Sequence, residues 1–528
     1  MKKIVKVALL LLITGSVASC NLDKYPDGDA IPADSAFETF DHASQFRRGM
    51  YYWTRQCFSS YTVIPVNIQA EGVNATLDYG NQMGFQYMWT FLDSDSYVEQ
   101  LWTYCYAAIY QINFFLEKAE ELIAADDALA EGNENKMTDA ERVQLNLYIG
   151  EAHLFRAMIN HQLATFYCKD YNPDTAKTDW GIILSKKVDV QARNERSTLF
   201  DTYDFINEDL STGKAALERY YNGTNAEQWE LDALPLASRT VQPYYLSPLT
   251  AQCLEAKVLL HTDQYEAAAT AAAAIADASV LISDASQFAD MWTNNTNGSE
   301  ILFQFYASVN EGRSDYGTLF LNDPYQDGKQ VQPMYLPSAW ILNQYDASDI
   351  RASTYFTSKP VLIGTTTYTG VKVISKYPGN PALNTNASVN ELMQNVVVYR
   401  SADFVLMAAE AYAQANNLSG ANQYLQKLMD ARISDPNYTY EPYTSIESVF
   451  EAIKLERLKE MFMEGNRIAD LKRWGEPMDR TGQDPQASSL VVTNGLYLKI
   501  EKTDYRFVWP IPQSEKTSNP SISNQLNW

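Results

Sequence analysis

Apolar side chains recur at helical spacing over four long stretches of the chain. These stretches occupy residues 97–128, 139–167, 202–220 and 450–474. In the first of them, positions i, i+4, i+7 and i+11 form one face, made of Trp102, Tyr106, Ile109 and Asn113. We therefore predict a long helix in each stretch, and we place Trp102 in the core.

Two pairs of shorter helices are predicted in the second half of the chain. Turn-forming residues separate the members of each pair, at 262–264 and at 416–420. The alanine run 267–274 allows close approach of two helices, while larger residues fill the space between them. This alternation resembles tetratricopeptide repeats, with helices at 247–261 and 265–275, and at 402–415 and 421–432. The stretches 139–167 and 202–220 are interpreted as a third pair with a long insertion.

Two segments between these helices show no regular pattern. Residues 60–95 are rich in Asn, Gly, Tyr and Thr, and residues 280–400 combine Gly, Asn and Pro with many aromatic residues. Short strand-like runs occur in the second segment at 300–305 and 396–399. Since long loops on a rigid scaffold usually carry function, we expect the binding chemistry in these two segments.

The first twenty residues have the composition of an export signal. Lys2 and Lys3 precede a mainly apolar run at 4–13, which is too short for a stable membrane span. The following motif, Val17-Ala18-Ser19-Cys20, resembles a bacterial lipobox, although valine stands where leucine is more usual. We predict a signal peptide at 1–19 and acylation of Cys20. Each buried CH2 group of the acyl chains contributes about 0.8 kcal/mol to membrane anchoring.

Charge and cysteine content narrow the range of functions. The formal net charge is −24, and loss of Lys2, Lys3 and Lys6 with the signal changes it to −27. Because phosphate binding needs a basic surface, we predict no nucleic-acid partner. An exported protein can oxidise its cysteines, but a large core does not need disulfides. The remaining cysteines lack metal-binding spacing, and we expect mostly buried thiols at Cys57, Cys105, Cys168 and Cys253.

Common catalytic motifs are missing from the sequence. It contains no GxSxG, HExxH, GxxxxGK[ST] or GxGxxG. Of the four histidines, His153 and His161 are offset by about 80° on a helix, which does not suit a shared metal. A glycosidase needs only two carboxylates, and none of the 65 acidic residues stands out as such a pair. We therefore predict no enzyme, no metal and no cofactor, with a surface glycoside hydrolase as a less favoured alternative.

Several segments together resemble the SusD/RagB family, the starch-utilisation-D-like outer-membrane lipoproteins. The most specific is Glu456-Arg-Leu-Lys-Glu-Met-Phe-Met-Glu-Gly-Asn-Arg-Ile-Ala-Asp-Leu-Lys-Arg-Trp-Gly475. Within it, Glu460 and Glu464 lie beside an apolar stripe, so we interpret them as structural charges. The other similar segments follow the order of the family, at 102–113, 150–157, 400–412 and 509–520.

The resemblance implies a fold, a location and a partner. The fold class is mostly α: tetratricopeptide-like hairpins form an α–α superhelical scaffold, and a large loop-rich lobe packs against it. An N-terminal region at 20–245 and a C-terminal region at 246–528 belong to one compact unit. The resemblance further implies that the protein is anchored in the outer membrane and faces the exterior. The partner that it implies is a SusC-like TonB-dependent transporter, over whose mouth the protein would sit as a lid.

The resemblance also implies that a ligand site forms from loops on one face. Sugar rings present apolar C–H faces to aromatic side chains, and their hydroxyls bond to amides and charged groups. We predict a site led by Trp89 and Trp292, with Tyr79, Asn81, Phe85, Tyr87, Arg313, Tyr316 and Tyr325. The expected function is capture of an oligosaccharide for the transporter. A peptide-binding protein on the same scaffold is the alternative.

Overall fold

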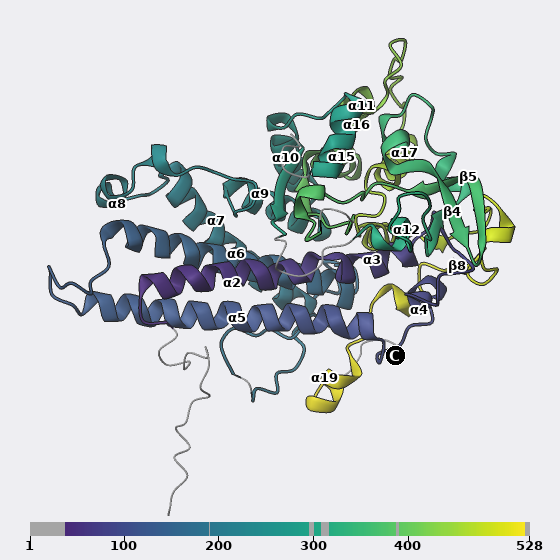
Figure 1. Ribbon diagram of the computed structural model, residues 1–528. Coiled ribbons are helices and arrows are strands. Elements are labelled where there is room, and N and C mark those ends of the chain that lie inside the picture. Colours follow the sequence, from purple (N-terminus) through teal and green to yellow (C-terminus); the bar gives the residue numbers. More distant parts are fainter. Residues whose placement is uncertain (1–36, 190, 295–299, 308–315, 387–389, 523–528) are drawn as a thin grey trace, which may run out of the picture.

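A computed structural model describes residues 37–189, 191–294, 300–307, 316–386 and 390–522 (Figure 1). Helices make up most of this part of the chain, and the strands form short antiparallel pairs. The mostly α class predicted from the sequence is confirmed. Residues 1–19, Cys20 and Arg313 lie outside the described residues.

Long helices that pack side by side form a scaffold. They are α2 (Phe40–Phe58), α5 (Ser96–Asp127), α6 (Asp139–Tyr167), α7 (Leu199–Asn222), α9 (Pro248–His261), α10 (Tyr265–Ala278), α15 (Ser401–Gln414) and α16 (Leu418–Arg432). The predicted hairpins form as α6 with α7, α9 with α10 and α15 with α16. Consecutive hairpins pack through α7–α9 and α10–α15, which produces the predicted superhelix (Figure 1). The sequence pattern did not predict α2, which packs on α5 and α6.

Local sequence determines where several scaffold helices begin. The carboxylate of Asp95 accepts amide hydrogen bonds in the first turn of α5. At the start of α6, Thr138 and Glu141 form a capping box, in which each side chain accepts the amide N–H of the other residue. Before α9, Ser247 caps the helix and Pro248 occupies its first turn. These caps satisfy amide groups that have no partner inside the helix.

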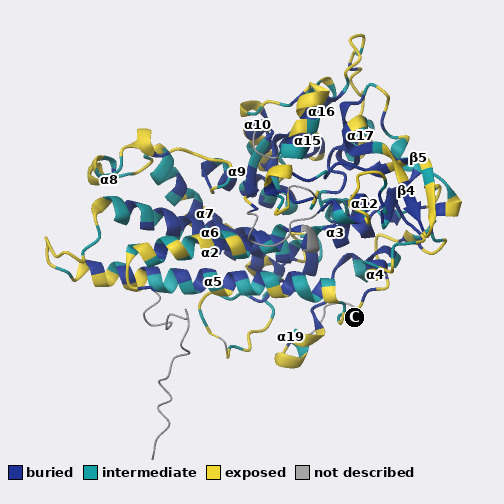
Figure 2. Ribbon diagram, in the orientation of Figure 1, coloured by how far each residue is buried: buried dark blue, intermediate teal, exposed yellow. Residues whose placement is uncertain are grey.

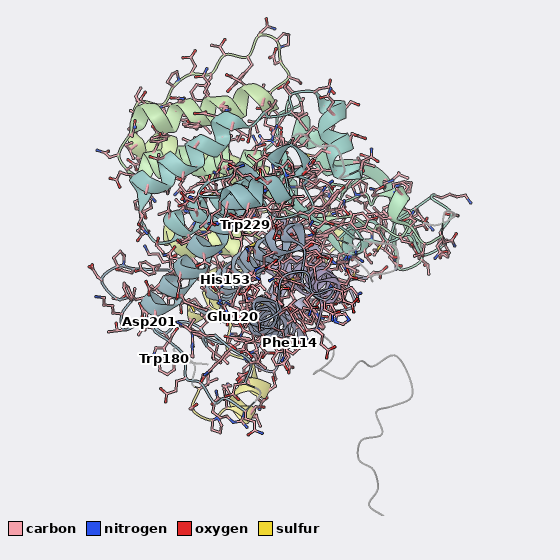
Figure 3. The ribbon with its side chains drawn as sticks, turned by 90° about the vertical axis from the view of Figure 1, so that its left-hand side faces the viewer. Phe114, Glu120, His153, Trp180, Asp201 and Trp229 are labelled. Carbon is pink, nitrogen blue, oxygen red and sulfur yellow. The ribbon has the colours of Figure 1, made fainter. Side chains whose placement is uncertain are left out.

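The contact between α6 and α7 requires small residues. A Cβ added at Gly150 would lie 2.3 Å from the Cβ of Ala216, so only glycine allows this approach. A buried charge cluster also joins the two helices. Asp209 of α7 accepts a hydrogen bond from Arg156 Nε of α6 at 2.7 Å. Asp209 also lies 2.7 Å from Nδ1 of His153 on α6. Figure 3 looks along the scaffold from the left-hand side of Figure 1 and labels His153.

Short elements form the second lobe. Up to residue 363 they are α3 (Ser60–Gln69), β1 (Val73–Ala75), α4 (Gly84–Met88), α11 (Ala285–Asn294), β2 (Ile301–Phe305), α12 (Thr318–Leu321), β3 (Tyr335–Pro337), α13 (Ala339–Leu342), α14 (Ile350–Tyr355) and β4 (Phe356–Ile363). After it come β5 (Thr366–Ile374), β6 (Val396–Arg400), α17 (Ile446–Glu460), α18 (Arg467–Trp474), β7 (Met478–Asp479) and β8 (Lys499–Ile500). The last helix, α19 (Gln513–Ser518), lies below α5 of the scaffold instead (Figure 1). A short helix, α8 (Gln228–Ala233), follows α7, and 3-10 turns occupy Leu236–Ser238, Pro381–Leu383, Ser488–Leu490 and Tyr505–Phe507.

The two segments expected to be irregular contain more order than their composition predicted. Residues 60–95 include the helices α3 and α4. In the second segment the predicted strand-like runs are confirmed, because β2 and β6 pair antiparallel with Gln304 opposite Val397. The other strand pairs are β1 with β3, β4 with β5, and β7 with β8.

The helix predicted at 450–474 is broken in the structure. It consists of α17 and α18, separated by residues 461–466, where Met463 and Gly465 adopt positive φ angles of 63° and 83°. Side chains from a distant segment bond the carbonyl groups that the break releases. Tyr377 donates its hydroxyl to Met463 O at 2.8 Å, and Lys376 donates Nζ–H to Phe462 O at 2.8 Å. The apolar stripe continues across the break, which is why the local pattern predicted one helix.

The main hydrophobic cluster joins the two predicted regions. Phe305, from the C-terminal region, stacks on Phe58 and Phe155 with centroid distances of 6.0 and 6.1 Å. Figure 2 shows buried residues concentrated where the helical scaffold meets the second lobe. On this basis we propose that residues 20–245 and 246–528 fold as one unit.

Several smaller expectations concern the interior. Cys57, Cys105, Cys168 and Cys253 are buried and free, as predicted. Trp102 is also buried, and its Nε1–H bonds to Glu515 at 3.2 Å. Among the described residues, no helix combines the length and the apolar character needed to cross a bilayer.

Candidate ligand-binding site

Two of the predicted platform residues are buried beside α4. Trp89 has no exposed surface, and its Nε1–H donates to Gln69 O at 2.9 Å. Its ring packs edge-on against Phe507, with 5.0 Å between centroids. Tyr87 is equally buried, and the guanidinium of Arg480 lies 4.2 Å from its ring centroid. The predicted role of Trp89 and Tyr87 is therefore corrected, since neither ring offers a face to a ligand.

Trp292 and Tyr316 also lie in the interior. Trp292 is 2% exposed, and Lys376 Nζ lies 4.3 Å from its ring centroid. Tyr316 is 6% exposed and donates its hydroxyl to Phe58 O at 2.9 Å. Both rings are therefore corrected from open platforms to buried residues, although Trp292 is still among the residues that line the groove described below. Their partners are distant in the sequence, so no local pattern could have predicted this burial.

The remaining described candidates are accessible. Phe85 and Tyr325 expose 54% and 62% of their surface. Tyr79 is half-buried and donates its hydroxyl to Asn81 Oδ1 at 3.1 Å. Asn81 is exposed and has a left-handed φ of 58°, a conformation that asparagine tolerates better than most residues. Aromatic faces and an amide are therefore available on two loops.

We call residues 76–85 and 322–332 the paired loops, because one side-chain hydrogen bond joins them directly and two more attach the first loop to Tyr335 and Gly364. Asp78 Oδ2 accepts from Gln332 Nε2 at 2.9 Å and from the amide N–H of Gly364 at 2.6 Å. The hydroxyl of Tyr335 donates to Gln82 O at 2.6 Å. Thus Tyr79, Asn81 and Phe85 lie on a loop fixed to the one that carries Tyr325 (α4 and α12 in Figure 1).

The loop of Tyr325 is itself ordered. The carboxylate of Asp323 accepts the amide N–H groups of Tyr325 at 3.0 Å, Gln326 at 2.9 Å and Gly328 at 2.7 Å. A groove of about 910 Å³ adjoins this loop, with residues 322, 323, 326–331 and 357–360 among its walls, whereas Tyr325 is not one of them. Polar side chains line much of it, including Asn322, Gln326, Lys329, Ser358 and Lys359. The second of the paired loops therefore borders a polar groove that is large enough for several sugar units, while the exposed rings of Phe85 and Tyr325 lie outside its lining.

Sequence reasoning missed Asp78 and Gln332, which connect the paired loops. Asp78 stands between Leu77 and Tyr79 in a segment without periodicity. Its role depends on a partner about 250 positions away, so the sequence alone carried no signal for it. Among the described residues, no cluster of three or more His, Cys, Asp or Glu side chains could hold a metal ion.

An interior cavity of about 120 Å³ lies apart from the paired loops and contains a histidine pair that was not anticipated. His161 and His261 line it, with 4.9 Å between their ring centroids. Burial, together with the nearby charge of Lys257, lowers the pKa of His161 to about 3. Burial and the neighbouring His161 likewise hold the pKa of His261 well below its usual value.

Acidification is expected to destabilise the protein through His161. The pKa of His161 is about 3 in the folded protein and 6.5 in the unfolded chain. Below pH 6.5, His161 is therefore protonated in the unfolded chain but stays neutral in the folded protein, which favours unfolding. At pH 5 this effect lowers the free energy of unfolding by about 2 kcal/mol relative to pH 7. Urea denaturation of the wild type and of His161→Gln at both pH values measures it. Equal pH dependence in the two proteins would contradict the prediction.

Two family models match the chain. The model described as "SusD family" matches residues 357–528. The model described as "Starch-binding associating with outer membrane" matches residues 44–234. Together the matches include scaffold helices from both halves of the chain and much of the second lobe. The chain belongs to the SusD family.

Solved structures of SusD relatives share this fold at low sequence identity. A SusD superfamily protein from Bacteroides thetaiotaomicron is 22% identical, with a TM-score of 0.71, and the match covers 93% of this chain and 100% of the relative. A SusD homologue from the same species is 18% identical, with a TM-score of 0.71 and coverage of 95% and 99%. A SusD-like carbohydrate-binding protein from Bacteroides vulgatus is 16% identical, with a TM-score of 0.67 and coverage of 93% and 99%. No curated protein sequence matched the chain.

Proposed function

We propose that this SusD-family protein is a lipid-anchored glycan-binding protein of the cell surface. It captures an oligosaccharide and passes it to a SusC-like TonB-dependent transporter, without catalysis. The observation that carries the proposal is the pair of hydrogen-bonded loops that presents Tyr79, Phe85 and Tyr325 beside amide and carboxylate groups. One relative is described as carbohydrate-binding, and one matching family model as starch-binding, which supports the same ligand class.

The chemistry of the paired loops suits a sugar. Phe85 and Tyr325 offer apolar ring faces for the C–H faces of pyranoses, while Asn81 and Tyr79 offer polar groups for the hydroxyls. The structure already orders both loops, so little conformational entropy is lost when a ligand binds. A rigid surface of this kind fits capture of a ligand followed by its release.

Weak binding is sufficient for this role. A millimolar dissociation constant corresponds to only about 4 kcal/mol of binding free energy. If Cys20 is acylated, the protein is tethered beside its transporter, and tethering can supply effective concentrations in the millimolar range. The anchor then raises the chance of transfer without tight binding. Changing Cys20 to alanine should move the protein from the outer-membrane fraction to the soluble fraction.

A double substitution tests the binding site. We expect Phe85→Ala with Tyr325→Ala to weaken glycan binding at least tenfold, because both exposed ring faces are lost. Maltoheptaose and a panel of plant and host polysaccharides serve as probes, measured by calorimetry and affinity electrophoresis. As a control, Tyr443→Ala removes an exposed tyrosine ring that lies outside the paired loops, and this variant should leave binding unchanged.

Three results would overturn parts of this proposal. Unchanged glycan affinity in the double variant would remove the paired loops as the site. Binding of a peptide pool with no binding of any glycan would favour the peptide-binding alternative. New reducing ends after incubation of glycans with the pure protein would show a hydrolase instead.

A further inference from the structure

A second cleft, separate from the paired loops, has walls from three parts of the chain. They are the middle of α2, the connection that leads into α9, and the end of β2. Its volume is about 280 Å³, which is suited to roughly one sugar ring, since pockets for larger organic ligands start near 300 Å³. Tyrosine and arginine dominate its lining.

The tyrosines give the cleft exposed ring surfaces. Tyr52, Tyr245 and Tyr306 are 38%, 40% and 51% exposed. Tyr306 packs edge-on against Tyr244, with 5.6 Å between centroids, and Tyr245 packs edge-on against Tyr51 at 5.4 Å. These contacts hold the rings in place while leaving parts of their surface open to a ligand.

The floor of the cleft is rigid. Tyr51 donates its hydroxyl to Glu151 Oε1 at 2.8 Å and accepts the amide N–H of Leu246 at 2.9 Å. Arg47 donates to both carboxylate oxygens of Glu151, at 2.6 and 2.7 Å. The guanidinium of Arg47 also lies 4.5 Å from the ring centroid of Tyr245. Glu151 is fully buried and paired with Arg47 through both carboxylate oxygens. Its negative charge is therefore neutralised within the floor and is not exposed to a ligand in the cleft.

The charge of the cleft is unusual for this protein. The chain has 65 acidic and 41 basic residues, yet no aspartate or glutamate is found among the described residues that line the cleft, whereas three arginines are. Arg55 donates Nη1–H to Tyr306 O at 2.9 Å. Arg48 is exposed and forms no ion pair with any described residue. A cationic group is therefore available beside exposed tyrosine faces.

From this geometry we propose that the cleft binds a sugar ring that carries a carboxylate or sulfate group. The ring lies against Tyr245 or Tyr306, and its anionic group pairs with Arg48. Guanidinium groups bind such oxyanions through two parallel hydrogen bonds. The exposed guanidinium of Arg48 beside the tyrosine rings favours an anionic sugar over a neutral one, which could contact the rings alone. The inference rests on the proposed function for the ligand class, but it concerns a different site.

Matched probes separate the contributions of charge and ring. Calorimetry on the full-length protein uses trigalacturonate, its methyl ester, a sulfated disaccharide and inorganic sulfate. We expect trigalacturonate or the sulfated disaccharide to bind at least tenfold more tightly than the methyl ester. The affinity should fall as salt is raised, because an exposed ion pair is screened. Equal binding of acid and ester, or binding of inorganic sulfate alone with no sugar preference, would overturn the proposal.

Variants connect this binding to the cleft. Arg48→Gln should lower affinity for the anionic sugar at least tenfold, and Tyr306→Ala should lower it as well. Arg193→Gln removes an exposed arginine between α6 and α7 and should have no effect. Because Arg48 is exposed, its replacement should leave the unfolding midpoint unchanged. Unaltered affinity in Arg48→Gln would contradict the assignment.

The two sites can fail independently. Arg48→Gln should leave binding of a neutral glycan intact, whereas Phe85→Ala with Tyr325→Ala should weaken it at least tenfold. If no glycan binds at all, the proposed function fails. If neutral glycans bind at the paired loops and anionic ones show no dependence on Arg48, only the second site fails.

Discussion

Replacing Glu460 with glutamine is expected to lower the free energy of unfolding by about 3–5 kcal/mol. Glu460 has no exposed surface and accepts hydrogen bonds from three arginines. Arg400 Nη1 lies 2.6 Å from Oε1, Arg432 Nε 2.9 Å from Oε2, and Arg351 Nη1 3.1 Å from Oε2. These cations hold the pKa of Glu460 well below its usual value against the effect of burial. Glutamine is neutral, so the three buried arginines would lose the carboxylate charge that balances their positive charges.

Urea denaturation at pH 7 measures the effect of Glu460→Gln. The matched control is Glu501→Gln, which removes an exposed carboxylate 3.3 Å from Lys499. An exposed ion pair of this kind contributes about 0–1 kcal/mol. A loss below about 1 kcal/mol in Glu460→Gln would show that the arginines are satisfied without the glutamate charge.

Replacing Trp89 with alanine is expected to cost about 3–5 kcal/mol of stability rather than to act on ligand contacts. The side chain fills a closed space against Phe507 and Phe91, and its Nε1–H bonds to Gln69 O. Removal therefore creates a cavity and takes one of two donors from Gln69 O, which also accepts from Arg480 Nη2 at 3.0 Å. The folded fraction of the variant should still bind glycan through the paired loops, with an affinity within about threefold of wild type.

Phe85→Ala provides the opposite case on the same segment. Phe85 is 54% exposed, so its loss should change stability by no more than about 0.5 kcal/mol while weakening ligand binding. Thermal unfolding and calorimetry on the two variants separate the roles. If Trp89→Ala lost glycan binding with an unchanged unfolding midpoint, the burial of Trp89 would not describe the ligand-binding state.

The sequence alone predicted features that depend on near neighbours. The helices α5, α6, α7, α9, α10, α15 and α16 and the strands β2 and β6 all occur where their patterns placed them. Hydrophobic periodicity and turn residues act over a few positions, and a single sequence displays such signals directly. The structural role of Glu460 was also predicted, because the apolar stripe beside it indicated a buried helix.

Tertiary structure decided what depends on distant partners. The break between α17 and α18 is stabilised by Lys376 and Tyr377, about 85 positions earlier, so the local stripe could not reveal it. Trp89 and Trp292 are buried, whereas Phe85 and Tyr325 are exposed, although all four are aromatic residues in segments of similar composition. Composition can show that a loop has rings suited to a sugar. Which rings remain open is determined only when the chain packs, because burial depends on the surfaces that other segments bring to each side.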